Sequence, residues 1–192
     1  MNINKQENTG IEVSVTSEDI TMEDADALIT AINSSGMWFG GIDGAIQRVA
    51  GNQYHKQATT MKLNDLDTVI ARGNRNNHNG HFDNVVFVID DLKSALHQII
   101  FRGLDSADEA GFKVVTIPAI RTGVMLGVVE GSLKEVVNEM IKGIKKYVIH
   151  SMTSKQINPR IERIKFVIYN NPMLEDMIKR TLIDSGFDKH EN

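Results

Sequence analysis

Residues 27–50, ALITAINSSGMWFGGIDGAIQRVA, constrain the fold more than any other stretch of the chain. The apolar, largely β-branched run Ala27–Ile32 has the length of a strand, and the small and polar residues of Asn33–Gly41 form a loop that ends in two glycines. After this loop the apolar residues follow the spacing of one helical face: Ile42, Ala45, Ile46 and Val49. A strand, a glycine loop and a helix bring backbone N–H groups and a helix N-terminus together, which is typical of an anion site, usually for phosphate.

Further apolar runs predict five more strands. They cover residues 11–16, 68–71, 85–89, 113–117 and 164–169.

Helical spacing follows three of these strands, beginning near Leu92, Leu133 and Pro172. Asp90-Asp91 suits the N-terminus of the first helix, and Ser132 with Glu135 predicts a capping box for the second. Residues 72–84 are predicted to be a loop and residues 151–159 a linker, whereas residues 52–67 give no clear pattern. Strands that alternate with helices predict an α/β sheet with helices on both faces.

A second loop, Pro118–Gly127 (PAIRTGVMLG), also follows a buried strand. In layered α/β sheets the ligand lies beyond the carboxyl ends of the strands. Two loops that leave carboxyl ends therefore predict one shared site at that edge.

Composition narrows the class of protein. With 192 residues the chain suits one domain, and its net charge of −4 argues against binding of duplex nucleic acid through a basic face. The absence of cysteine excludes disulfides and thiolate zinc sites, and no apolar run approaches the ~18 residues of a membrane span. His78 and His81 have no neighbouring carboxylate cluster, so we assign no metal. We expect a cytoplasmic location, with no membrane partner.

Four segments, in order, resemble the signature of the macrodomain family of ADP-ribose-binding modules. They are Ser17–Thr21, Asn33-Ser34-Ser35 with Gly40–Ile46, Pro118–Val124, and Tyr169-Asn170. The resemblance implies a three-layer α/β/α sandwich with a mixed, mostly parallel sheet. It implies one domain over residues 11–186, with flexible tails at residues 1–10 and 187–192, and no cofactor.

The resemblance also assigns roles to individual residues. It implies that Asp19 accepts the adenine amine, that Asn33 orients the distal ribose, and that Asp43 activates the water that attacks at C1″. Without the resemblance, Asp19 is interpreted as a helix cap or turn residue. Asp43 is then interpreted as an aspartate in the first turn of a helix. The other residues implied to bind the ligand are Ile20, Gly40, Gly41, Ile42, Thr122, Gly123, Val124, Met125, Tyr169 and Asn170.

Several residues depart from the family pattern. Thr30 replaces the first asparagine of the strand-end motif, and Gln47 stands where a histidine is common. Arg121 replaces a small residue, and its side chain either points into solvent or reaches the diphosphate or an extra terminal phosphate. Trp38 and Phe39 either cover the ribose or pack against the protein.

Three functions remain open from the sequence. The first is hydrolysis of a group from the distal ribose of ADP-ribose, as an ADP-ribose-1″-phosphate phosphatase or an ADP-ribosyl ester hydrolase, including one that acts on ADP-ribosylated protein. The second is non-catalytic binding of ADP-ribose or a related nucleotide signal. The third is an interaction protein that has kept the fold and lost the pocket. We favour the first, with Asp43 and Asn33 as the catalytic residues.

Overall fold

The central layer of the computed structural model, which describes residues 10–36, 41–154 and 161–187, is a six-stranded sheet. Its strand order is β1-β6-β5-β2-β4-β3, and every neighbouring pair is parallel except β3–β4 at one edge. The sheet is therefore mixed and mostly parallel, as predicted. The strands are β1 (Glu12–Thr16), β2 (Ala25–Ile32), β3 (Thr68–Ala71), β4 (Phe82–Ile89), β5 (Val114–Ile117) and β6 (Arg163–Val167).

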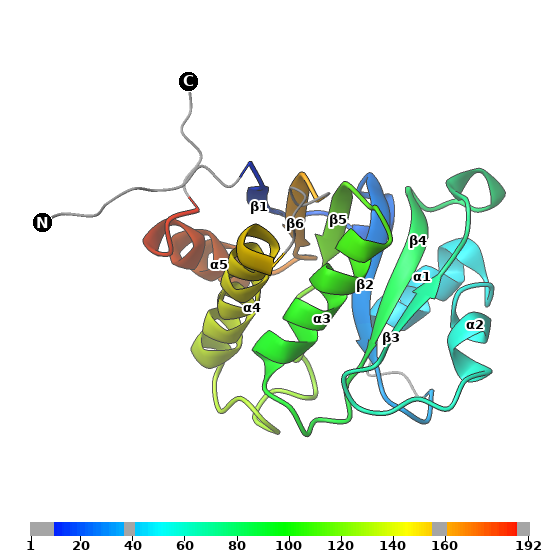
Figure 1. The fold of residues 1–192 in the computed structure, drawn as a ribbon, viewed down its shortest axis with the longest axis horizontal. Helices are drawn as coiled ribbons and strands as arrows, with labels where there is room; N and C mark the ends of the chain where they lie inside the picture. The colour runs from blue at the N-terminus through cyan, green and yellow to red at the C-terminus, as the bar shows by residue number, and fades with distance from the viewer. Residues whose placement is uncertain (1–9, 37–40, 155–160, 188–192) are drawn as a thin grey trace, which may run out of the picture.

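Helices cover both faces of this sheet (Figure 1). One face carries α3 (Leu96–Glu109), α4 (Leu133–Ser154) and α5 (Pro172–Asp184), and the other carries α1 (Gly41–Ala50) and α2 (His55–Thr59). Two short 3₁₀ helices, η1 (Ile20–Met22) and η2 (Arg75–Asn77), lie in the connections. The three-layer α/β/α sandwich is thereby confirmed. No helix of the described residues is long and apolar enough to cross a membrane.

Strand β2 shows why the sequence requires two covering layers. Alternate side chains of a strand point to opposite faces of the sheet. Ala27 and Ile29 pack into the core beneath α3 and α4, whereas Leu28 and Ile32 pack into the core beneath α1 and α2. A strand that buries both faces reads as a continuous apolar run, and this is the pattern that identified Ala27–Ile32.

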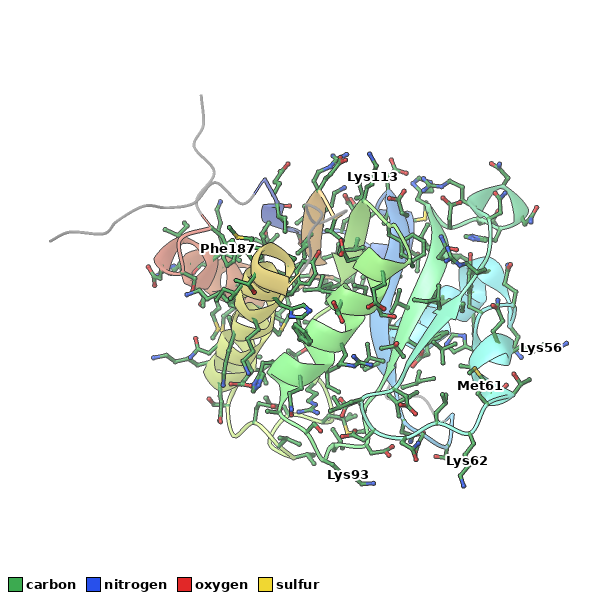
Figure 2. The ribbon with its side chains drawn as sticks, viewed as in Figure 1. Lys56, Met61, Lys62, Lys93, Lys113 and Phe187 are labelled. Atoms are coloured by element: carbon green, nitrogen blue, oxygen red, sulfur yellow. The ribbon has the colours of Figure 1, made fainter. Side chains whose placement is uncertain are left out.

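The ligand-site loops leave one edge of the sheet. Figure 2 labels Lys113, which precedes β5, at one edge, and Lys93, which comes after β4, at the opposite edge. The loops after β2, β4 and β5 all leave the edge that Lys93 marks. The loops after β2 and β5 carry most of the residues that the sequence assigns to a ligand site.

Helix α3 begins later than predicted. The helix starts at Leu96 rather than near Leu92, which has a positive φ of 59°. Asp90 does not cap this helix, because its carboxylate bonds the Leu92 N–H and the Arg121 guanidinium. The prediction that Asp90-Asp91 opens the helix is therefore wrong. The tertiary ion pair takes the aspartate that the local pattern assigned to a cap.

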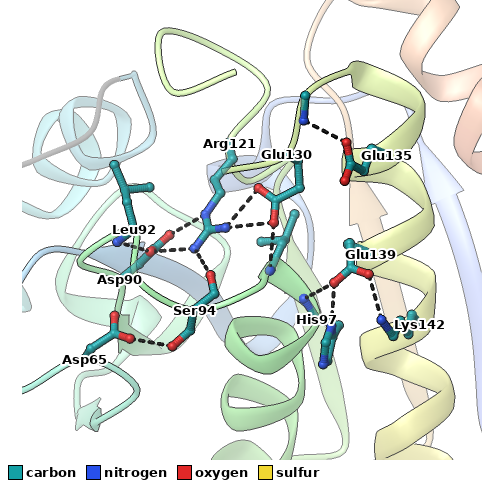
Figure 3. Close-up of polar contacts among 12 residues, drawn as sticks. Asp65, Asp90, Leu92, Ser94, His97, Arg121, Glu130, Glu135, Glu139 and Lys142 are labelled. Atoms are coloured by element: carbon teal, nitrogen blue, oxygen red, sulfur yellow. Dashed lines mark hydrogen bonds and ion pairs between the residues drawn. The ribbon is translucent and has the colours of Figure 1, made fainter. Parts of the chain in front are cut away.

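Three other boundaries also differ from the prediction. Helix α4 continues through residues 151–154, which were predicted to be linker, and β4 begins at Phe82, inside the predicted loop. Helix α2 lies in residues 52–67, where no pattern was found. The capping interaction before α4 is present in altered form, because Ser132 Oγ accepts from the Glu135 N–H. The Glu135 carboxylate accepts from the Gly131 N–H rather than from the Ser132 N–H (Figure 3).

Candidate functional site

A cavity of about 510 Å³ lies at the edge of the sheet that the two glycine-containing loops leave. This volume is within the range of small-molecule sites in proteins. Its walls come from η1 and the residue before it, from β2 and α1, from the end of β4, from the loop after β5, and from the segment between β6 and α5. The sheet order places Tyr169, after β6, and Asp90, after β4, toward opposite ends of the cavity.

Most of the residues singled out from the sequence line this cavity. They are Asp19, Ile20, Gly41, Ile42, Asp43, Arg121, Thr122, Gly123, Val124, Met125 and Tyr169. Asn33 and Asn170 are not among its lining residues, although the residue after Asn170, Asn171, is. Gly40, Trp38 and Phe39 lie outside the described residues.

Asp19 combines the two interpretations that the sequence left open. Its Oδ1 accepts hydrogen bonds from the Thr21 N–H at 2.9 Å and from the Thr21 hydroxyl at 2.8 Å, which makes it the cap of η1. The same residue lines the cavity beside the buried Ile20. Capping therefore fixes the Asp19 carboxylate at the cavity wall.

Asn33 closes β2 and forms a local turn. Its side-chain oxygen accepts from the Ser35 N–H at 3.1 Å and from the Ser35 hydroxyl at 2.9 Å. This is an Asx turn, in which a short polar side chain bonds the backbone two residues ahead. In this conformation the Asn33 amide oxygen serves the loop rather than the cavity.

Asp43 is one of two buried carboxylates that line the cavity, and Asp90 is the other. Asp43 lies in the first turn of α1, where the helix dipole stabilises a negative charge. Its side chain is 3% exposed, and its Oδ1 accepts a hydrogen bond from His55 Nε2 at 2.8 Å. The fully buried His55 ring packs against Phe87 of β4, with the ring centroids 4.9 Å apart. A buried carboxylate with a histidine partner is thus presented to the cavity.

The sequence analysis missed His55. The hydrogen bond to Asp43 comes from α2, and not from Gln47, which lies one turn after Asp43 on α1. His55 lies in the uninterpreted residues 52–67, between the buried Tyr54 and Ala58. In the sequence, only the position of His55 between Tyr54 and Ala58 indicated that its side chain is buried. This pattern does not predict which residue His55 bonds.

Arg121 is buried, which rules out the first of its two alternatives, a side chain that points into solvent. Its guanidinium is 2% exposed and lies between Asp90 and Glu130, in a group that we call the Arg121 cluster (Asp90, Arg121 and Glu130; Figure 3). Nε and Nη2 donate to Asp90 at 2.9 and 2.7 Å, Nη1 donates to both oxygens of Glu130 at 2.9 Å, and Nη2 also donates to the Ser94 carbonyl. Burial alone would lower the pKa of Arg121, but its bonds to the two carboxylates raise that pKa.

The Arg121 cluster also corrects the second interpretation of this arginine. A guanidinium has five N–H groups, and the five bonds to Asp90, Glu130 and Ser94 match that number. No donor remains for a diphosphate or a terminal phosphate. Arg121 has a φ of +62° and lines the cavity. Its guanidinium bonds Asp90, Glu130 and the Ser94 carbonyl within the protein.

Arg48 lines the cavity and was not singled out from the sequence. It lies in the last turn of α1 and is exposed, and it lines the cavity together with Ala45 of the preceding turn. Arg48 is three residues after Ala45, so the two residues share a face of α1, and this spacing could have indicated its position. Among the described residues, no group of three or more histidines or carboxylates could hold a metal ion.

Comparison with known proteins agrees with this geometry. The Macro domain family model matches residues 29–134, which include both loops. A Macro domain-containing protein of Streptomyces coelicolor is 30% identical over 122 residues, which are 58% of this chain and 72% of that protein. The O-acetyl-ADP-ribose deacetylase of an Enterobacter species is 27% identical over 91% of this chain and 96% of its own length.

Solved structures extend the likeness to the whole fold. A Trypanosoma brucei macrodomain, crystallised in complex with ADP-ribose, matches 89% of this chain and 69% of its own, with a TM-score of 0.71 and 15% sequence identity. At that identity the likeness concerns the fold alone. Because the family model covers more than half of the 192 residues, the chain belongs to the macrodomain family.

Proposed function

We propose that the chain binds ADP-ribose or a derivative in this cavity and hydrolyses a group from the distal ribose, with Asp43 as the catalytic residue. The observation that carries the proposal is the buried Asp43 carboxylate, which lines the cavity and accepts a hydrogen bond from His55. Support for the ligand comes from the T. brucei macrodomain that was crystallised with ADP-ribose, and support for hydrolysis comes from the relative named as a deacetylase.

The cavity walls suit the parts of such a ligand. The carboxylate of Asp19 and the ring of Tyr169 lie toward one end, where an adenine amine and an aromatic face would find an acceptor and a stacking surface. Gly123 and its neighbours in the loop after β5 line the adjoining stretch, and backbone N–H groups of such loops bind phosphates without a lysine. The distal ribose would then lie near Asp43.

In the proposed reaction Asp43 accepts a hydrogen bond from a bound water and orients it toward the ester at C1″. The water attacks C1″ as Asp43 takes its proton, the bond from C1″ to the ester oxygen breaks, and Asp43 returns the proton to the leaving group, so the products are ADP-ribose and the released acid. His55 is a positioning residue, because it holds one oxygen of the carboxylate and leaves lone pairs on the other. A positioned base contributes about 10²–10⁴ to a rate.

The test separates turnover from binding. Asp43→Asn keeps the shape of the side chain, so we expect ADP-ribose binding in calorimetry to persist while ester hydrolysis falls about 100-fold or more. Asp108→Asn is the matched control, because Asp108 is also a buried aspartate, on α3, but it does not line the cavity. Hydrolysis that survives Asp43→Asn, or binding that disappears with it, would contradict the catalytic assignment.

Binding without turnover is the second candidate function. The observation in its favour is Asn33, whose amide oxygen bonds Ser35 instead of lining the cavity. Calorimetric binding of ADP-ribose, with AMP as the control ligand, tests this candidate. Tight binding of ADP-ribose with no hydrolysis of any ester by the wild type would select it.

A further inference from the structure

The Arg121 cluster bounds the end of the cavity that lies away from Tyr169. Asp90 and Arg121 both line the cavity. Glu130 does not line it, and its carboxylate accepts a hydrogen bond from the Leu96 N–H at the N-terminus of α3 (Figure 3). The side chains of Asp90, Arg121 and Glu130 are 1%, 2% and 4% exposed. Charges this deeply buried are screened much less than charges on the surface, so they act on a group bound beside them.

The charges of the cluster do not cancel. Two carboxylates bond one guanidinium, which leaves one excess negative charge. The Leu96 N–H, at the N-terminus of α3, donates to Glu130 at 2.9 Å, and this stabilises the charged carboxylate and offsets part of its field. Asp43 adds a further carboxylate to the same cavity. This end of the cavity is therefore negative.

The cations nearby do not reverse this sign. Arg48 also lines the cavity, but it lies in the last turn of α1 and is exposed, so water screens its field. Lys93 pairs with Asp91 at 3.6 Å, and its side chain is 72% exposed, so water screens its field (Figure 2). Arg121 has no free donor, since its N–H groups bond Asp90, Glu130 and the Ser94 carbonyl. A phosphate at this end would meet negative charge and no guanidinium.

From this geometry we infer that the Arg121 cluster is a specificity determinant, which selects against a phosphate at C1″ of ADP-ribose and for an uncharged ester there. The inference rests on the proposed function, because it needs the distal ribose to lie at this end of the cavity. An acyl ester adds no charge at C1″, whereas a phosphate monoester adds one to two. The substrate class is therefore an acyl ester of ADP-ribose.

The first measurement needs no variant. Calorimetry with the wild type should show ADP-ribose-1″-phosphate binding about tenfold or more weaker than ADP-ribose, because like charges at short distance in a buried site repel by more than the 1.4 kcal/mol of a tenfold change. Equal or tighter binding of the phosphate would overturn the inference. If ADP-ribose itself did not bind, the proposed function would fail instead, so the two failures are distinct.

The second measurement assigns the discrimination to residues. Glu130→Gln removes one negative charge without touching the cavity wall, so the binding ratio between the two ligands should narrow by about threefold to tenfold. Asp91→Asn is the control: it removes a charge from the same region but does not contact Arg121, and the ratio should change less. An unchanged ratio in folded Glu130→Gln would overturn the assignment. If Glu130→Gln did not fold, Asp90→Asn would repeat the test with the carboxylate that lines the cavity.

Discussion

Two buried groups of polar side chains contribute residues to the wall of the same cavity, and they are built in opposite ways. Asp43 of α1 and His55 of α2 form a pair, in which one carboxylate oxygen is bonded and the other keeps its lone pairs. The Arg121 cluster joins the loop after β5, which carries Arg121 and Glu130, to Asp90 at the end of β4, and there every guanidinium N–H is bonded to Asp90, Glu130 or a carbonyl.

This difference indicates which of the two groups can take part in a reaction and which one stabilises the structure. A group takes part in a reaction only if it can form a new hydrogen bond to the substrate or to water. The Arg121 guanidinium cannot, so its contribution is to hold two loops together and to set the charge of the cavity. Asp43 can, because its partner occupies only part of the carboxylate. We therefore expect substitutions in the Arg121 cluster to affect stability most, and substitutions in the Asp43–His55 pair to affect turnover most.

The largest effect on stability is expected from Arg121→Ala. The change leaves Asp90 and Glu130 buried with no cation, and breaking a buried ion pair in this way costs about 3–5 kcal/mol. Urea denaturation followed by circular dichroism measures the free energy of unfolding. Arg180→Ala is the control, because Arg180 forms a pair with Asp176 on the exposed surface of α5, and such pairs contribute about 0–1 kcal/mol. Equal losses in the two variants would show that the cluster does not stabilise the fold.

An intermediate effect is expected from a double-mutant cycle on Asp43 and His55. His55→Leu should cost more when Asp43 is present than in the Asp43→Asn background, because the buried carboxylate then loses its hydrogen bond. We expect a coupling energy of about 1–3 kcal/mol from urea denaturation of the four proteins.

The matched cycle uses Asp24→Asn and His81→Leu. These two side chains lie 3.7 Å apart, but both are exposed, so their coupling should stay below about 0.5 kcal/mol. A coupling energy at Asp43 and His55 no larger than this value would mean that the histidine does not hold the carboxylate. The positioning role of His55 would then be lost, whatever the turnover of Asp43→Asn.

Most of the fold could be predicted from the sequence, because local patterns of apolar residues identify most of its strands and helices. Nearly continuous apolar runs, Ala27–Ile32 and Val85–Ile89, identified the central strands, since a strand covered on both faces has no solvated side. Pro172 marked the start of α5 for a similar local reason, as a proline suits the first turn of a helix. Most residues assigned to the site from the two loops also line the cavity, because loops that leave carboxyl ends meet at one edge.

The partners of the buried charges could not be predicted in the same way. Arg121 bonds Asp90, which is 31 residues earlier, and His55 bonds Asp43 from a separate helix. Charged residues are rarely buried unless they are paired, so an arginine in a loop favours a surface position until its partners are known. Tertiary pairing also moved the start of α3, because it removed Asp90 from the helix cap that local pattern predicted.

The smallest effect is expected at the contact that joins the two regions. Asp91 comes after β4 and accepts a hydrogen bond from the Ser34 N–H of the first loop at 2.9 Å. Burial by itself raises the pKa of Asp91. The hydrogen bonds from Ser34 and the charge of Lys93 lower this pKa by more than burial raises it, so the pKa lies below its ordinary value. A carboxyl with a lowered pKa stabilises the folded state above its unfolded pKa of about 3.9, and this contribution is lost as the pH falls through the folded pKa.

Asp91→Asn should therefore flatten the acid limb of the stability curve. At pH 5–6 we expect the variant to be less stable than the wild type by about 1 kcal/mol or less, with the difference shrinking as the pH falls from about 4 toward 2. The measurement is the urea unfolding free energy at intervals of half a pH unit. Asp184→Asn, on the exposed end of α5, is the control and should leave the slope unchanged. If Asp91→Asn lost stability as steeply in acid as the wild type, the Ser34 contact would carry no linkage, and the first loop would be held independently of the Arg121 side of the cavity.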